Sequence, residues 1–175
     1  MTTVVFSHGQ ESGPWGTKIR SMAELVRGMG CAAESIDYQG IADPTERVEK
    51  CMRECADLSD KLILVGSSMG GHVATAAAAD VGAAGLFVLA PAYYMEGYED
   101  LTPEPPSIPI CIVHGWHDDV VPVENSIRYA RSCSATLHIV DGDHRLTANI
   151  DEIKEYLEYF VNEISGQFPE LGGKK

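Results

Sequence analysis

The stretch LILVGSSMGG (Leu62–Gly71) joins an apolar run to a glycine-rich turn that contains two adjacent serines. Its four apolar residues are typical of a buried strand, and the VATAAAAD that follows shortly after is typical of a helix. The five residues Gly66–Gly70 fit Gly-x-Ser-x-Gly at the junction of the two elements, with Ser68 in the centre. In that context the central serine lies on a tight turn with its hydroxyl accessible. Serine is also a favoured helix N-cap, so the motif alone leaves a capping role for Ser67 and Ser68 open.

Outward from this turn, apolar runs alternate with helical stretches along the chain. Strands are predicted at Thr3–Ser7, Ala33–Asp37, Lys61–Val65, Leu86–Leu89, Ile108–Val113 and Thr136–Val140, and helices at about 15–29, 43–58, 73–80, 123–131 and 150–164. Strands that alternate with helices imply right-handed crossovers and a parallel sheet covered on both faces. We therefore predict an α/β fold, a three-layer sandwich with about six strands, all parallel. One domain is expected over residues 1–165, with a flexible C-terminal tail over 166–175.

Composition narrows the partners and the compartment. The 175 residues carry a formal net charge of −13, and no apolar run approaches the roughly 20 residues of a membrane span. An acidic chain is a poor partner for nucleic acid, which requires clustered Lys and Arg, so small molecules are the expected ligands. Five cysteines without zinc spacing predict neither a disulfide framework nor a structural zinc. The N-terminal residues do not resemble a signal peptide, so we expect a cytoplasmic protein. The sequence does not specify its oligomeric state.

Residues with reactive side chains follow the predicted strands directly. Ligands of parallel sheets bind beyond the carboxyl ends of the strands, and Ser68 follows the third strand, His114–Asp119 the fifth and Asp141–His144 the sixth. A serine hydroxyl becomes a nucleophile when a histidine takes its proton and an acid holds that histidine. The order serine, acid, histidine at one sheet edge therefore indicates nucleophilic catalysis by Ser68. The helix that starts beside it would stabilise negative charge formed there.

Four segments together, SHGQESG, GSSMGG, HGWHDDVVP and DGDHR, resemble the α/β-hydrolase family, specifically its small esterase-like members akin to dienelactone hydrolases. The resemblance covers nearly the whole chain and implies a minimal α/β-hydrolase fold without a large lid. It implies Ser68 as nucleophile, His144 as general base and acid, and Asp118 as the residue that orients His144. The family pattern HGxxDxxVP places the acid at its fifth position, which is Asp118, while Asp119 stays open as the alternative.

The same resemblance implies an oxyanion hole formed by the backbone N–H groups of Gln10 and Met69. The chain departs from the family at two points: it begins at what would be the third strand, and its elbow residue is serine where dienelactone hydrolases have cysteine. The second departure favours a general carboxylic ester or thioester as substrate. We expect a serine esterase that needs no cofactor. The alternatives are a thioesterase and a non-catalytic binding protein of the same fold.

Substrate size and metal binding are the least constrained by the sequence. Trp15, Tyr93, Tyr94 and Trp116 are candidates for an aromatic pocket, and packing of the loops onto the sheet explains them equally well. HGWHDD contains two histidines and two acids, but on a strand end this spacing does not bring both rings to one face, so no metal site is predicted. Other histidines receive structural roles: His8 braces the loop after the first strand, His72 is a surface or packing residue, His114 is structural, and His138 points away from the site.

Overall fold

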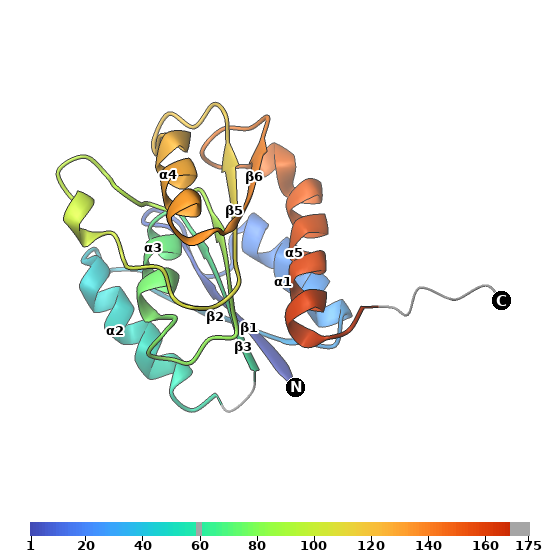
Figure 1. The fold of residues 1–175 in the computed structure, drawn as a ribbon. Coiled ribbons are helices and arrows are strands. Elements are labelled where there is room, and N and C mark those ends of the chain that lie inside the picture. Colours follow the sequence, from blue (N-terminus) through green and yellow to red (C-terminus); the bar gives the residue numbers. More distant parts are fainter. Residues whose placement is uncertain (59–60, 169–175) are drawn as a thin grey trace.

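The computed structural model describes residues 1–58 and 61–168, and within them six strands form one sheet. The strand order is β2-β1-β3-β4-β5-β6, and every neighbouring pair is parallel. The strands are β1 (Thr2–Ser7), β2 (Ala32–Ile36), β3 (Lys61–Ser67), β4 (Gly85–Leu89), β5 (Ile110–Gly115) and β6 (Thr136–Val140). The predicted six-stranded, all-parallel sheet is thus confirmed (Figure 1).

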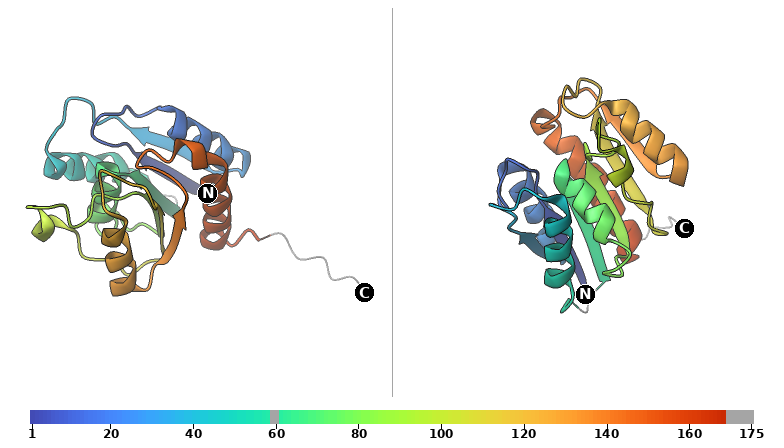
Figure 2. Two further views of the ribbon diagram at one scale, coloured as in Figure 1. Left: turned by 90° about the horizontal axis from the view of Figure 1, so that it is seen from above. Right: turned by 90° about the vertical axis from the view of Figure 1, so that its left-hand side faces the viewer.

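Helices cover both faces of the sheet, which makes the predicted three layers (Figures 1 and 2). One face carries α1 (Thr17–Gly28) and α5 (Ile150–Ser165), and the other carries α2 (Pro44–Cys55), α3 (Met69–Ala77) and α4 (Val123–Cys133). The core is accordingly split in two by the sheet. Alternate residues of each strand enter opposite halves: Val4 and Phe6 pack on the side of α1 and α5, whereas Val5 packs on the other side.

Local sequence accounts for where the helices begin. Asp43 caps α2 by accepting a hydrogen bond from the Thr45 N–H at 2.8 Å, and Pro44 occupies the first helical position. The same helix ends at Cys55, three residues earlier than the sequence pattern suggested, because the Ala56 N–H pairs with the Arg53 carbonyl in a tighter final turn.

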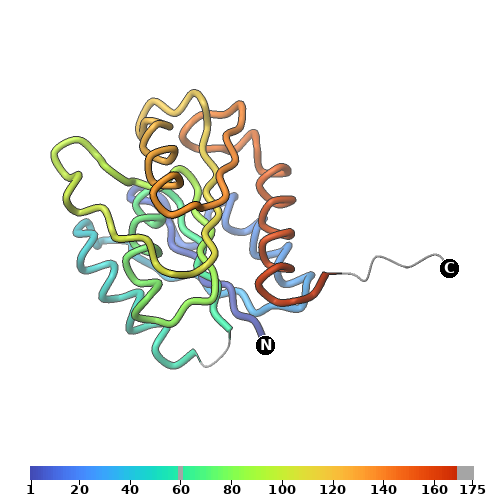
Figure 3. The backbone as a smooth tube through the Cα atoms, viewed as in Figure 1, coloured from blue at the N-terminus to red at the C-terminus, as the bar shows by residue number. Residues whose placement is uncertain are grey.

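Between β4 and β5, residues 90–109 leave the body of the fold as a long connection without a helical lid (Figure 3, yellow-green). Its one regular element is the 3₁₀ turn η1 (Glu99–Leu101). The connection is tied to itself by the Tyr94 N–H, which donates to Thr102 Oγ1 at 2.7 Å. This segment is too short to form a separate lid, in keeping with the expected fold without a large lid.

The chain after α5 is described as far as Phe168, so most of the predicted tail, residues 169–175, lies outside the described residues. Gly166 ends α5 in a left-handed conformation, and the Phe168 ring lies 5.4 Å from the ring of Tyr159. Within the described ranges, no helix has the length and apolar character needed to cross a membrane.

Candidate active site

The turn between β3 and α3 is strained and closely packed. Ser68 has φ 55° and ψ −119°, a backbone conformation that non-glycine residues rarely adopt and that costs on the order of 1–3 kcal/mol. A Cβ at Gly66 would overlap the Gly70 carbonyl, and a Cβ at Gly70 would overlap the Ser7 carbonyl. The glycines of Gly-x-Ser-x-Gly are therefore required by the close approach of neighbouring backbone. The Ser68 N–H donates to the Leu89 carbonyl of β4 at 2.9 Å, which fixes the turn to the sheet.

Three side chains from separate loops form one hydrogen-bonded chain. His144 Nδ1 lies 2.7 Å from Asp118 Oδ2, and His144 Nε2 lies 3.1 Å from Ser68 Oγ. An ionised carboxylate only accepts, so Nδ1 carries the proton and Nε2 is free to accept from the Ser68 hydroxyl. Of the two adjacent aspartates, Asp118 makes this contact, while Asp119 is exposed. The structure thus brings together the three residues that the sequence singled out.

The side chain of Asp118 is completely buried, and both of its carboxylate oxygens accept hydrogen bonds. Its Oδ1 accepts the N–H groups of Val120 at 2.9 Å and Val121 at 2.7 Å. Burial alone would raise the pKa of Asp118, but the hydrogen bonds from His144 and from the two backbone N–H groups outweigh it and lower the pKa below its ordinary value. Asp118 is therefore an anion at neutral pH, in the state needed to hold His144.

His114 supports this carboxylate from the protein interior. Its Nε2 donates to the Val121 carbonyl at 2.9 Å and lies 3.0 Å from Asp118 Oδ2, and its Nδ1 accepts from the Ser126 hydroxyl at 2.7 Å. Burial lowers the pKa of His114, despite the opposing effect of Asp118, so the ring is neutral. The sequence predicts only a structural role for His114. Its contact with Asp118 shows that this structural role is to support the carboxylate that holds His144.

The loop that carries His144 is fixed from two sides. Asp143 Oδ1 accepts the N–H groups of Arg145 and Leu146, both at 3.0 Å, and closes the loop on itself. From α1, Lys18 Nζ donates to the Arg145 carbonyl at 2.6 Å. Burial lowers the pKa of Lys18 to about 8, although Asp143 opposes that shift. The position of His144 therefore depends on a helix more than a hundred residues away, which no local pattern reveals.

Beside Ser68 lies a cavity of about 410 Å³. Gln10, Ser68 and Met69 all line it, so the two residues predicted to supply oxyanion donors border the same cavity as the serine. Met69 is the first residue of α3, where backbone N–H groups have no partner within the helix. The other lining side chains are mostly apolar. The full set is Pro44, His72, Ala92, Met95, Tyr98, Leu101, Val120 and Val121.

The four aromatic residues proposed for the pocket do not line this cavity. Tyr93 is fully buried, with its hydroxyl bonded to Thr75 and its ring stacked on Tyr129 at 4.0 Å. Tyr94 lies under the Arg128 guanidinium, 3.8 Å from its ring centre.

The two tryptophans also lie elsewhere. Trp15 packs against Arg27 at 5.3 Å, and Trp116 is 57% exposed. Tertiary contacts turn Tyr93 toward the core and turn Tyr94 and Trp15 toward arginines, as the alternative of loop packing implies for these three rings. His72, which the sequence analysis gives as a surface or packing residue, lines the cavity, and the chain offers no local signal for that position.

The remaining histidines have other partners. His138 stacks on Tyr156 of α5 at 3.8 Å, away from Ser68. His117 Nε2 lies 2.9 Å from Asp141 Oδ1 at the surface. In residues 1–58 and 61–168, no group of three or more His, Cys, Asp or Glu side chains is arranged to hold a metal ion.

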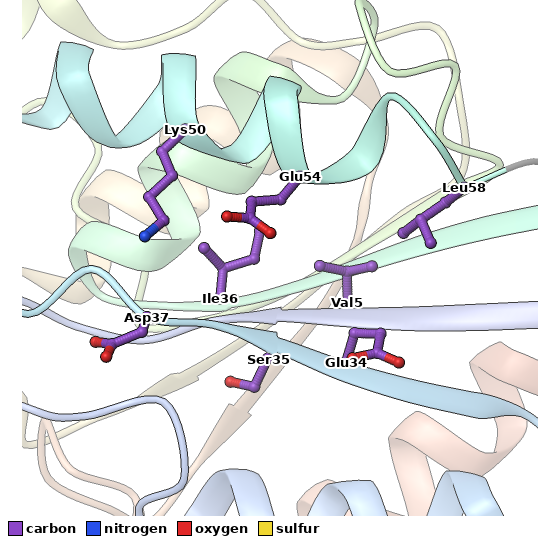
Figure 4. A pocket seen from close by; sticks show the side chains of 8 residues that line it. All are labelled: Val5, Glu34, Ser35, Ile36, Asp37, Lys50, Glu54 and Leu58. Atoms are coloured by element: carbon purple, nitrogen blue, oxygen red, sulfur yellow. The ribbon is translucent and has the colours of Figure 1, made fainter.

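A second cavity of about 410 Å³ lies at the edge strand β2 (Figure 4). Lys50 and Glu54 reach into it from α2, and Glu34 and Asp37 lie along or after the strand. It contains neither Ser68 nor His144, and its lining is largely polar and charged. The cavity at Ser68 is therefore the candidate active site.

Comparison with known proteins agrees with this architecture. A family model described as "Alpha/beta hydrolase domain" matches residues 2–163. A bovine protein named palmitoyl-protein thioesterase ABHD10, mitochondrial, is 25% identical over an alignment that covers 85% of this chain and 68% of the relative.

Solved structures give the same result. An α/β-superfamily protein from Xanthomonas campestris pv. campestris has a TM-score of 0.85 and 27% identity, covering 92% of this chain and 98% of that one. Est1E from Butyrivibrio proteoclasticus, solved with ferulic acid bound, has a TM-score of 0.79 and 17% identity, covering 95% and 90%. With its fold, its strained serine turn and a family match over nearly all its length, the chain belongs to the α/β-hydrolase family.

Proposed function

We propose that this protein is a serine hydrolase that cleaves carboxylic esters through an acyl-enzyme. The observation that carries the proposal is the chain of hydrogen bonds from Asp118 through His144 to Ser68 Oγ, which ends at a cavity. This arrangement supplies what a hydroxyl nucleophile needs: a base within hydrogen-bond reach and a buried anion that fixes the base in the correct tautomer.

The proposed reaction has two halves. In the first, Ser68 Oγ attacks the ester carbonyl while His144 Nε2 takes its proton, and His144 then returns that proton to the leaving alcohol. In the second, water attacks the acyl-serine, again with His144 Nε2 as base, and releases the carboxylic acid. The N–H groups of Gln10 and Met69 are the proposed donors to the oxygen that becomes negative in both steps, and each such donor is worth about 3–4 kcal/mol.

The cavity favours small, uncharged substrates. Its volume of about 410 Å³ is in the range of small-molecule sites, and among the described residues its lining contains no Lys or Arg that would pair with a carboxylate or phosphate on the substrate. Burial lowers the pKa of His72, the ionisable side chain of the wall besides the tyrosine, so that ring is neutral as well. Short acyl or aromatic groups without charge therefore fit the site best.

Hydrolysis of 4-nitrophenyl butyrate by paired serine variants tests the proposal. Ser68→Ala should lower kcat by about 10⁶-fold, as in other enzymes with such triads. Ser67→Ala is the matched control, because its hydroxyl belongs to the same turn but makes no bond to His144, and it should stay within about threefold of the wild type. Loss of activity in Ser67→Ala alone would show that Ser67, and not Ser68, is the nucleophile. Full activity in both variants would refute the proposal.

A thioesterase is the second candidate, favoured by the bovine relative named as a palmitoyl-protein thioesterase and by the apolar wall of the cavity. The same Ser68 acyl-enzyme would form from either ester. Rates on oxygen and sulfur esters of one acyl group separate the two: a kcat/KM at least tenfold higher for the sulfur ester, after correction for intrinsic reactivity, would identify a thioesterase.

The partner and compartment of the protein stay predictions from the sequence. We propose a small-molecule ester as the ligand and the cytoplasm as the location. The five cysteines are free thiols, in keeping with a reducing compartment. Measuring the distribution of a tagged chain among cell fractions would test the location.

A further inference from the structure

Arg47 of α2 is a charged residue with only 2% of its surface exposed. Within the described ranges of the chain, no carboxylate pairs with it. Its guanidinium instead donates to four backbone carbonyls: from Nε to Ile41 at 2.6 Å, from Nη1 to His8 at 3.3 Å and Gly9 at 3.2 Å, and from Nη2 to Gln10 at 3.4 Å. Three of these acceptors are consecutive residues of the loop after β1. Burying a charge costs free energy. A buried guanidinium whose hydrogen bonds go mainly to one short loop therefore indicates a specific role in that loop.

The neighbouring His8 acts on the same loop. Its Nε2 lies 2.8 Å from the Tyr38 backbone nitrogen, which can only donate, so the ring proton must be on Nδ1. That Nδ1–H donates to the Gly9 carbonyl at 2.7 Å. Burial lowers the pKa of His8, and the nearby Arg47 lowers it further, which keeps this neutral tautomer. The Gly9 carbonyl thus accepts two hydrogen bonds, one from His8 and one from Arg47.

The Gly9 carbonyl and the Gln10 N–H belong to one peptide group. No peptide bond is cis in the described chain, so the N–H points away from the oxygen that Arg47 and His8 hold. The loop also lies against the serine turn, since a Cβ placed on Gly9 would be 3.7 Å from Ser68 Cβ. Holding the carbonyl on the buried side therefore turns the N–H toward the cavity. A cation at the oxygen also polarises the peptide and makes its N–H a better donor.

We propose that Arg47 is a positioning residue for ester hydrolysis: with His8 it fixes the plane of the Gly9–Gln10 peptide, so that the Gln10 N–H is aimed at the developing oxyanion. This inference rests on the proposed function. It differs from a role in folding alone, because a residue that only stabilises the fold would change the free energy of unfolding and leave turnover of the folded enzyme intact.

The test compares Arg47→Met and Arg47→Lys with Arg27→Met. Arg27 is the matched control, since it also donates to a backbone carbonyl, that of Ala33 at 3.2 Å, and lies over an aromatic ring, but it belongs to α1 and not to this loop. Three quantities are measured for each folded variant: kcat and KM for 4-nitrophenyl butyrate, and Ki for an alkyl trifluoromethyl ketone. In that inhibitor Ser68 Oγ adds to the ketone carbon, its proton passes to His144, and the ketone oxygen becomes an alkoxide in the oxyanion hole.

Arg47→Met should lower kcat by 10²–10³-fold with KM within threefold, and should raise Ki in parallel with the loss of kcat, because substrate binding in the ground state does not use the oxyanion donor. Arg47→Lys keeps the charge but not the fork of donors, and should lose at least tenfold in kcat. Arg27→Met should change neither constant beyond threefold. The lysine variant serves as the test if the methionine variant does not fold.

Folded Arg47 variants with kcat and Ki within threefold of the wild type would overturn the inference, and so would an equal loss in Arg27→Met. The failure of the proposed function is distinct, because it appears in the wild type: no Ser68-dependent hydrolysis is then measured at all.

Discussion

Replacing Asp118 with asparagine changes one atom and should remove most of the activity. Oδ1 accepts from the N–H groups of Val120 and Val121, so the amide oxygen of the new residue must take that position. The amide NH₂ then occupies the place of Oδ2 and faces His144 Nδ1, which lies 2.7 Å away in the wild type. Two donors cannot face each other, so the ring changes tautomer and puts its proton on Nε2. Ser68 then loses the acceptor for its proton.

The expected magnitude follows from that tautomer. A ring with the wrong tautomer leaves oxyanion stabilisation and binding intact but removes the general base, which lowers kcat by about 10⁴-fold, or about 5.4 kcal/mol at 1.36 kcal/mol per decade. Initial rates of 4-nitrophenolate release measure it, with urea unfolding as the check on folding. Asp119→Asn is the matched control, since this neighbour is exposed, and should change kcat less than threefold. Activity of folded Asp118→Asn within tenfold of the wild type, or an equal loss in Asp119→Asn, would refute the reasoning.

Three further predictions concern packing, pH and substrate size. Gly70→Ala should lose 1–3 kcal/mol or more in the free energy of unfolding, because its Cβ overlaps the Ser7 carbonyl, whereas Gly28→Ala, where a Cβ meets nothing within 4 Å, should lose nothing; equal thermal midpoints would contradict this. Burial lowers the pKa of His114 in the folded protein from 6.5. The neutral ring therefore contributes fully to stability above pH 6.5, and this contribution is lost as the pH falls below 6.5. Wild-type stability in urea should therefore decline more steeply from pH 6.5 to 5 than that of His114→Asn, by at most about 1.4 kcal/mol per pH unit, and parallel curves would count against the shift. Ala92→Leu adds bulk to the cavity wall and should lower kcat/KM for a butyrate ester at least tenfold relative to the acetate ester; an unchanged ratio would show that acyl groups bind elsewhere.

The sheet, the helices and the chemistry of the loops were readable from the sequence because each depends on local signals. Apolar runs of strand length and helical spacing mark the elements, and the strained turn at Ser68 requires glycines that are visible as a motif. The preference for Asp118 over Asp119 came from the family pattern, and the structure supplies its physical reason. A carboxylate that accepts the N–H groups two and three residues ahead closes its own loop, and Asp118 does so in front of Pro122.

The pocket and the buried arginine were not readable, because their side-chain directions are decided by distant contacts. Tyr93 follows β4 but turns into the core, where its hydroxyl finds Thr75 and its ring finds Tyr129. Arg47 lies in a polar helix and resembles a solvent-exposed residue in the sequence. Its burial depends on the loops around Gly9 and Ile41, which come together only in the folded sheet. In both cases composition and spacing carry no information about the partner.

The central claim is that Ser68 is an activated nucleophile, and labelling with a fluorophosphonate tests it without knowledge of the substrate. The probe phosphonylates a serine hydroxyl only where a base withdraws its proton. Incubation of the folded protein followed by peptide mass spectrometry should find one adduct, on Ser68, with no adduct in Ser68→Ala and a rate at least a thousandfold lower in His144→Ala. An unlabelled wild type, or an adduct on Ser67 instead, would contradict the account.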